Sequence, residues 1–131
     1  MTITFLSSQP EFCVRARRAE SLTISSVAMP GRPSQLFITA SGELDAGNVR
    51  FFADQVCALV AAGRDVCLDL SSLDFFAVDG CTALHAINAV VMQKGATWSV
   101  LPNPGVTRVL QLCDPAGVIP IDGAVTLAKP A

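Results

Sequence analysis

The chain has 131 residues, of which 51% are apolar and only 15% are charged, so it can bury the core of one domain and is not expected to be disordered. Its formal net charge of -2 argues against nucleic acid as a partner, because that function needs a basic face. No uninterrupted apolar run approaches the roughly 20 residues that a membrane-spanning helix needs, so direct membrane insertion is not expected.

The N-terminal residues and the cysteines both favour a cytoplasmic protein. The opening segment MTITFLSSQPEF lacks the basic residues and the long apolar run of a signal peptide. The five cysteines are scattered and form no Cys-x-x-Cys pair, which predicts buried, reduced thiols. With a single histidine and no metal-ligand or nucleotide-binding motif, the sequence predicts neither a metal site nor a cofactor.

From residue 22 onward the sequence predicts a hairpin and then a helix. Residues 22–29 and 35–44 are rich in β-branched side chains and flank the turn sequence PGRP, which predicts two antiparallel strands. Apolar side chains such as Val49, Phe52 and Val56 recur at steps of three and four, which predicts a helix within residues 45–63. Asp45 is the predicted N-cap of this helix, and Gly63 marks its end.

The rest of the chain alternates between strands and helices. Strands are predicted at 65–70, 97–101 and 118–121, and helices at 78–95 and 103–117. Because strands that alternate with helices need crossover connections, the predicted fold is α/β. It has a mixed β-sheet, with an N-terminal antiparallel hairpin and then a parallel βαβαβ arrangement, and helices packed on the sheet. Residues 1–20 form an N-terminal extension of undecided structure, and residues 123–131 a C-terminal tail.

One pair of side chains is a candidate for catalysis. Cys81 and His85 lie one turn apart in the predicted helix 78–95, and a cysteine at a helix N-terminus is a common nucleophile. No second base, oxyanion donor or metal-ligand set completes a mechanism around them. We therefore expect a protein that is not an enzyme and has no catalytic residues.

Three segments in order resemble the signature segments of the STAS domain: ITASGELDAGNVRFF, DVCLDLSSLDFFAVDGCTAL and NPGVTRVLQL. This family includes the bacterial anti-sigma-factor antagonists, also called anti-anti-sigma factors, and the cytosolic domains of sulphate transporters. The resemblance extends over about residues 22–121 and implies a STAS-like sheet. It therefore implies a STAS domain at residues 21–122.

The resemblance implies a function in protein–protein interaction, in the transcription regulation of a bacterial stress response. In the antagonists, the turn before the second helix docks on an anti-sigma factor, a protein kinase of the histidine-kinase-like ATPase type, which then releases its sigma factor. The same kinase phosphorylates a serine of the D-S-S-G turn and so breaks the complex. Carried over to this chain, the implied partner-binding residues are Ser41, Asp45, Ala77, Val78, Asp79, Gly80 and Cys81.

The chain departs from the family pattern at the switch position. With Gly80 aligned to the family glycine, Val78 replaces the phosphorylated serine and has no hydroxyl. Asp79 is interpreted as a carboxylate that interacts with the positive end of a helix. The nearby hydroxyls that remain as alternative acceptors are those of Thr82, Ser71 and Ser72.

Two functions remain open from the sequence. The first is an anti-sigma-factor antagonist that lacks the usual phosphorylatable serine and is controlled in another way. The second is a STAS subunit of a membrane transport or lipid-trafficking complex, which needs no such serine. The sequence leaves a homodimer open in both cases.

Overall fold

The computed structural model describes residues 2–5, 14–19, 21–29 and 31–122 of the chain. Their elements are β1 (Thr2–Phe5), β2 (Val14–Ala19), β3 (Leu22–Met29), β4 (Arg32–Leu44), α1 (Val49–Leu59), β5 (Asp65–Phe76), α2 (Asp79–Lys94), β6 (Thr97–Leu101) and α3 (Pro104–Cys113). Cys13, for which a buried thiol is predicted, and the predicted tail 123–131 lie outside the described residues.

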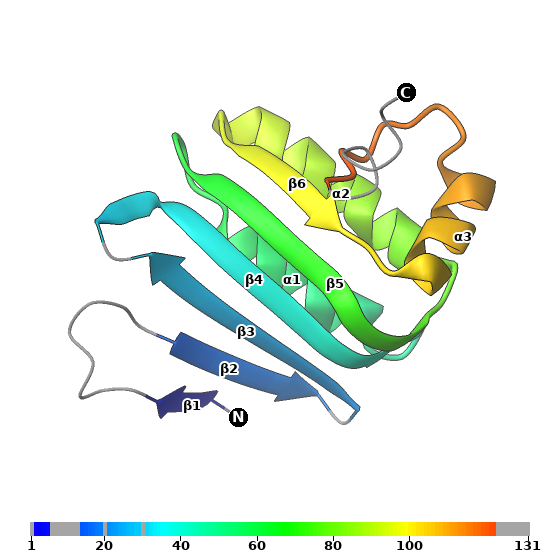
Figure 1. Cartoon of the computed structure of the whole chain (residues 1–131), viewed down its shortest axis with the longest axis horizontal. Helices are drawn as coiled ribbons and strands as arrows, with labels where there is room; N and C mark the ends of the chain where they lie inside the picture. Colours follow the sequence, from blue (N-terminus) through cyan, green and yellow to red (C-terminus); the bar gives the residue numbers. More distant parts are fainter. Residues whose placement is uncertain (1, 6–13, 20, 30, 123–131) are drawn as a thin grey trace.

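All the described strands belong to one sheet, in the order β1-β2-β3-β4-β5-β6 (Figure 1). The pairs from β1 to β4 are antiparallel, whereas β4–β5 and β5–β6 are parallel. This confirms the predicted α/β fold, with an antiparallel hairpin followed by parallel strands that alternate with helices. The extension 1–20 contributes β1 and β2, which add two antiparallel strands to the hairpin side of the sheet.

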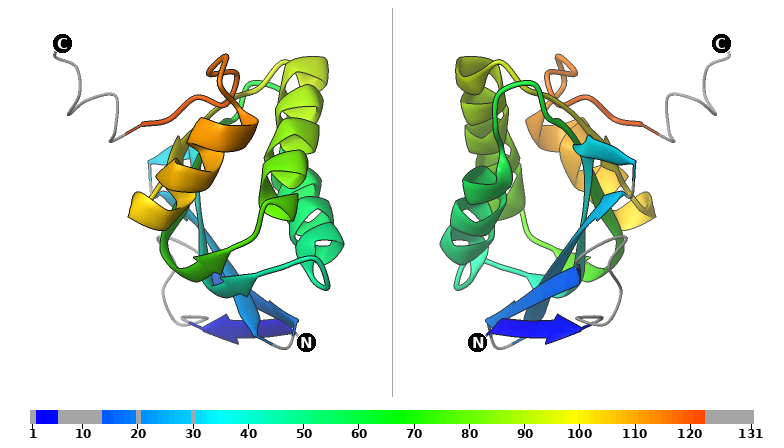
Figure 2. Two further views of the ribbon diagram at one scale, coloured as in Figure 1. Left: turned by 90° about the vertical axis from the view of Figure 1, so that its right-hand side faces the viewer. Right: turned by 90° about the vertical axis from the view of Figure 1, so that its left-hand side faces the viewer.

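Helices α1 and α2 lie side by side on one face of the sheet, and α3 lies near the carboxyl end of β6 (Figures 1 and 2). The period-2 alternation of the strands points every second side chain toward α1 and α2. The inward side chains are buried with those of the helices in one core, which includes Leu36, Ile38, Phe52, Val56, Val66, Leu68, Leu84, Ile87 and Val100. Within the described part of the chain, no helix has the length and apolar character needed to cross a membrane.

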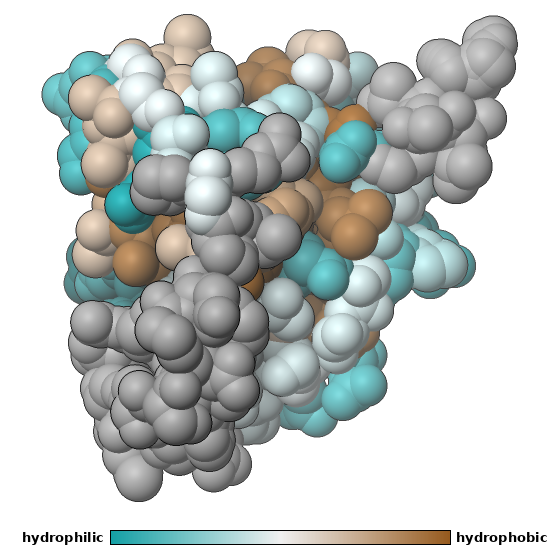
Figure 3. Space-filling view, turned by 60° about the vertical axis from the view of Figure 1, so that its left-hand side comes forward, coloured by the Kyte–Doolittle hydropathy of each residue, from teal (hydrophilic) through white to brown (hydrophobic). Residues whose placement is uncertain are grey.

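The other face of the sheet carries the alternate side chains, which are only half-buried. Thr39, Asp69 and Ser99 project there beside the apolar groups of Phe37 and Cys67. In the space-filling view, hydrophobic and hydrophilic surface is interspersed (Figure 3). This face therefore does not have the continuous apolar surface of a helix-covered layer.

Several predicted bounds differ from those in the structure. Helix α1 ends at Leu59 with Val60 as its C-cap, so the prediction that Gly63 marks its end is wrong. β5 continues past the predicted end at residue 70 to Phe76, because its polar residues still pair with β4, from Ser41 with Ser72 to Leu44 with Phe76. The predicted strand 118–121 is reduced to one parallel bridge between Val100 and Ile121. It follows a helix that ends at residue 113, not 117.

Gly42 is required by the hairpin at the end that leads to α1. It has a φ of 100°, and a Cβ at this position would collide with the carbonyl oxygen of Ser21. That carbonyl accepts a hydrogen bond from the backbone N–H of Glu43 at 3.0 Å, so the start of β3 and the end of β4 are held close together. Only glycine has both the conformation and the size for this position.

We therefore expect Gly42→Ala to lower the free energy of unfolding by about 3 kcal/mol, because both strain and a steric clash are introduced. Gly63→Ala is the matched control, since Gly63 also has a positive φ (74°) but a Cβ added there would meet nothing within 4 Å. The control should lose only about 1 kcal/mol. Urea unfolding followed by circular dichroism measures both values, and equal losses would contradict the close approach at Gly42.

Candidate functional site

The parallel pairing of β4 and β5 brings two of the predicted site segments together at one edge of the sheet. The backbone N–H of Ala77 donates to the carbonyl of Leu44 at 2.9 Å, which ties the connection after β5 to the end of β4. Asp45 and the residues 77–81 therefore meet at this edge. Ser41 pairs with Ser72 farther down the strands, roughly 10 Å from Leu44 at about 3.3 Å per residue.

The segment 77–80, which we call the β5–α2 turn, is compact. The N–H groups of Gly80 and Cys81 donate to the carbonyls of Ala77 and Val78 at 2.8 and 2.9 Å. These are the i→i+3 bonds of a tight first helical turn. Val78 directs its side chain outward and is 60% exposed, and Asp79 is also exposed, in the first turn of α2. The position of Asp79 in the first turn is the one expected for a carboxylate at the positive end of a helix, and the favourable interaction itself stays a prediction.

The packing at the start of α2 explains why position 80 is a glycine. It is buried, and a Cβ at this position would lie 2.5 and 2.7 Å from two ring carbons of Phe76. Phe76 is itself a core residue, so its ring has little room to move away. The glycine therefore lets the start of α2 pack directly on the last aromatic side chain of β5.

The prediction that Asp45 caps helix α1 is wrong, because a turn separates the two. The Asp45 carboxylate accepts from the N–H groups of Gly47 (2.9 Å) and Asn48 (3.2 Å), and the helix begins only at Val49. Asp45 therefore stabilises the turn at 45–48 in the manner of an Asx turn. Its carboxylate is used locally, close to the β5–α2 turn.

Asn48 is a site residue that is absent from the residues predicted from the sequence. Its side-chain oxygen accepts from the N–H of Asp45 at 2.9 Å, and its amide nitrogen donates to the carbonyl of Glu43 at 2.8 Å. It is only 7% exposed. Asn48 thus joins the end of β4 to the start of α1, and its spacing of three residues from Asp45 is the signal that could have indicated this reciprocal pair.

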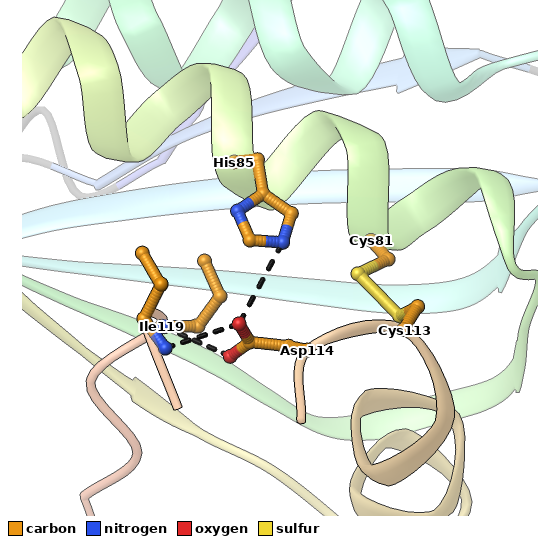
Figure 4. Close-up of polar contacts among 6 residues, drawn as sticks. Cys81, His85, Cys113, Asp114 and Ile119 are labelled. Carbon is orange, nitrogen blue, oxygen red and sulfur yellow. Dashed lines mark hydrogen bonds and ion pairs between the residues drawn. A yellow bond between two sulfur atoms is a disulfide. The ribbon is translucent and has the colours of Figure 1, made fainter. Parts of the chain in front are cut away.

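The prediction of reduced thiols is wrong for two cysteines, because Cys81 and Cys113 form a disulfide in the structure (Figure 4). Their Cα atoms are 6.5 Å apart, although 32 residues separate them in sequence. Cys57 and Cys67 are free and half-buried, and burial raises the pKa of both thiols.

The disulfide also rules out Cys81 and His85 as a catalytic pair in this structure. The sulfur of Cys81 is bonded to Cys113, and Nε2 of His85 lies 3.8 Å from a carboxylate oxygen of Asp114 (Figure 4). In this state Cys81 has no thiol that His85 could activate. Among the described residues, no group of three or more His, Cys, Asp or Glu side chains is placed to hold a metal ion.

Apolar and acidic side chains gather around the β5–α2 turn. Phe75 in β5 is 53% exposed, and Val78, three residues later in the turn, is 60% exposed. The acidic residues of this edge are Glu43, Asp45, Asp74 and Asp79, and the segments 41–48, 71–82 and 102–107 contain no lysine or arginine. A shallow hollow of about 220 Å³ adjoins them, lined by Leu73, Asp74, Phe75, Phe76, Asn103, Pro104 and Gly105. The exposed side chains of this edge are therefore apolar at Phe75 and Val78 and acidic at Glu43, Asp74 and Asp79.

The three hydroxyls near the turn differ in their surroundings. Ser71 donates to the carboxylate of Asp69 at 2.5 Å and is thus engaged in a local hydrogen bond. Ser72 is exposed in β5, and Thr82 is exposed in α2, four residues after Val78 and so on the same helix face. Of the three, Thr82 lies closest in sequence to the switch position.

The family model described as "Mlab, STAS domain" matches residues 27–121. The crystal structure of an anti-sigma factor antagonist from Mycobacterium paratuberculosis is similar, with a TM-score of 0.56 and 18% sequence identity over 95% of this chain and 97% of that chain. At this identity the similarity concerns the fold. No curated protein gives a significant match.

We expect Asn48→Ala to lower the free energy of unfolding by about 2 kcal/mol, because it removes a buried side chain and leaves the part-buried N–H of Asp45 and carbonyl of Glu43 without their side-chain partner. Asp45→Ala should cost only about 1 kcal/mol, because it removes bonds to the exposed N–H of Gly47 and to the N–H of Asn48, which also donates to the backbone carbonyl of Asp45 at 3.3 Å. Urea unfolding of both variants measures the difference. A smaller loss for Asn48→Ala than for Asp45→Ala would contradict the assigned role of Asn48.

Proposed function

Since this chain belongs to the STAS domain family, we propose that it is an anti-sigma-factor antagonist. It binds an anti-sigma factor of the histidine-kinase-like ATPase type in the cytoplasm and frees the sigma factor that the kinase holds. The observation that carries the proposal is the exposed Val78 in the β5–α2 turn, with exposed Phe75 and exposed acidic residues at the same edge of the sheet. The similar fold of an anti-sigma factor antagonist supports it.

The chemistry of this edge defines the partner surface that it fits. Protein interfaces combine an apolar, desolvated centre with a polar rim, and complementary charges in the rim speed association and fix the orientation. Val78 and Phe75 provide the centre, while Asp74, Asp79 and Glu43 are exposed around it. The proposed partner therefore presents an apolar patch with basic residues at its border.

The antagonist is proposed to work without the phosphorylation switch at the family position. Valine has no oxygen that could accept a phosphoryl group, so position 78 stays neutral and apolar. Asp79 adds one negative charge, which is only about half that of a phosphoserine and lies one residue farther along. The interface at Val78 thus does not gain the charge that breaks the complex in other antagonists.

A second candidate function is a STAS subunit of a membrane transport or lipid-trafficking complex. Two observations favour it: the matching family model is described by the name Mlab, and Val78 removes the serine that the sigma-factor circuit uses. The same edge of the sheet would then dock on a component of the transport assembly. The two functions differ in which protein the β5–α2 turn binds.

The binding test uses each anti-sigma-factor kinase of the native organism, purified and immobilised, with the natural chain and with Val78→Glu. We expect Val78→Glu to raise the Kd about 100-fold or more, because a charge would be buried at the centre of the interface. Met92→Glu is the matched control, since Met92 is also an apolar residue of α2, 73% exposed, but lies near the other end of the helix.

The control should bind as the natural chain does, and both variants should keep its circular dichroism spectrum. Equal binding by Val78→Glu would place the interface elsewhere. No binding of the natural chain to any of the kinases would contradict the antagonist function, and binding to a transport component would support the second candidate.

The phosphorylation test incubates the chain with the kinase that it binds and ATP, followed by measurement of the intact mass. We expect no change in mass, because the kinase is proposed to act on the family position, where Val78 offers no acceptor. Val78→Ser restores a hydroxyl at the family position and should gain the mass of one phosphate. A phosphate on the natural chain would show that another hydroxyl, for which Thr82 is the first candidate, has taken over the switch.

A further inference from the structure

The disulfide joins two helices at the site described above. Cys81 is in the first turn of α2, three residues after Val78, and Cys113 is the last residue of α3 (Figure 4). The bond therefore attaches the carboxyl end of α3 to the segment that follows the β5–α2 turn. This places a group with reversible covalent chemistry directly beside the proposed interface.

The opposite end of α3 is attached to the strand that precedes the turn. Asn103 caps α3 by accepting from the N–H of Val106 at 2.9 Å, and its amide nitrogen donates to the carbonyl of Leu73 at 2.8 Å. Leu73 lies in β5 before the turn, and Cys81 lies in α2 after it. Helix α3 is thus connected by one end to β5, before the β5–α2 turn, and by the other end to α2, after the turn.

Among the described residues, few other polar contacts hold the carboxyl end of α3 to α2. The Asp114 carboxylate accepts from the N–H groups of Val118 and Ile119 at 3.0 and 2.9 Å, and these bonds stay within the following segment. The 3.8 Å approach of His85 to Asp114 is the polar contact that reaches across to α2 (Figure 4). Loss of the disulfide would therefore leave this end of α3 held by the His85–Asp114 approach and by the packing of Leu110 in the core, with no covalent link to α2.

We propose that Cys81 and Cys113 form a thiol–disulfide switch that sets the mobility of the β5–α2 turn. In the oxidised form α3 holds the turn on both sides. In the reduced form the covalent link on the Cys81 side is lost, and the turn opens more often. The consequence for partner binding rests on the proposed function, whereas the switch itself is a property of this chain.

The two thiols differ in access, which gives the order of oxidation by a small disulfide such as oxidised glutathione. Cys113 is half-buried, whereas Cys81 is only 3% exposed. The Cys113 thiolate attacks oxidised glutathione, forms a mixed disulfide and releases one glutathione thiolate. The Cys81 thiolate then attacks the Cys113 sulfur and releases the second glutathione, so that two protein thiols are oxidised and one glutathione disulfide is reduced. The two protons from the protein thiols end on the two glutathione molecules.

The experiment compares the purified full chain in oxidised and in reduced glutathione. Differential alkylation and peptide mass spectrometry identify the paired cysteines, and Cys57 and Cys67 are internal controls that should remain thiols in both buffers. Hydrogen exchange then reports on the N–H groups of Gly80 and Cys81, which donate to carbonyls of the turn, and on the N–H of Ala77, which donates to Leu44 at the end of β4. We expect these amides to exchange about tenfold faster in the reduced form, and the amides of α1 to be unchanged.

Cys113→Ser is the matched variant, because it removes the link but leaves the turn sequence intact. Its turn amides should exchange at the fast rate in both buffers. The proposal is overturned if oxidised glutathione does not pair Cys81 with Cys113, or if the turn amides of the natural chain exchange equally in the two forms. Because no partner is used, either result concerns the switch alone and leaves the proposed antagonist function to its own binding test.

Discussion

The parallel pairing of β4 and β5 is the constraint on which the candidate site depends. Because both strands run in the same direction, the connections to α1 and α2 leave the sheet at the same edge. The hydrogen bond from Ala77 to Leu44 then fixes the height of the β5–α2 turn relative to the end of β4. A shift of this register by one residue would turn the buried side chains of β5 outward, so core packing and site geometry are set together.

Much of the fold could be predicted from the sequence because most of its elements have strong local signals. The hairpin, the three helices and the strands around residues 65–70 and 97–101 follow from β-branched runs, from helical periodicity and, for α2, from the terminal Gly95. The extension of β5 could not be predicted in the same way, because Ser71, Ser72 and Asp74 have the composition of a turn. Their strand conformation depends on pairing with β4, and a local pattern carries no information about such a partner.

The site is less predictable than the fold, because its details depend on contacts between distant segments. The position of Val78 follows from the resemblance, and its exposure agrees with a surface role. An acidic residue before a helical pattern is the usual cap, which predicts this role for Asp45, but the chain first makes a turn that Asn48 closes. The pairing of Cys81 with Cys113 depends on the packing of α3, which brings together residues that are 32 apart in sequence.

The absence of a hydroxyl at position 78 limits the ways in which partner binding by this turn can be regulated. A phosphate acts from outside, through charge added to the contact surface, and an apolar Val78 excludes that mechanism at its own position. The proposed link between Cys81 and Cys113 would act from the inner side of the turn, through α3, and would leave the exposed surface of Val78 and Phe75 chemically unchanged. The disulfide would then control the affinity for the partner through conformational entropy. A turn that the disulfide already holds rigid loses less conformational freedom when it binds than a mobile turn does.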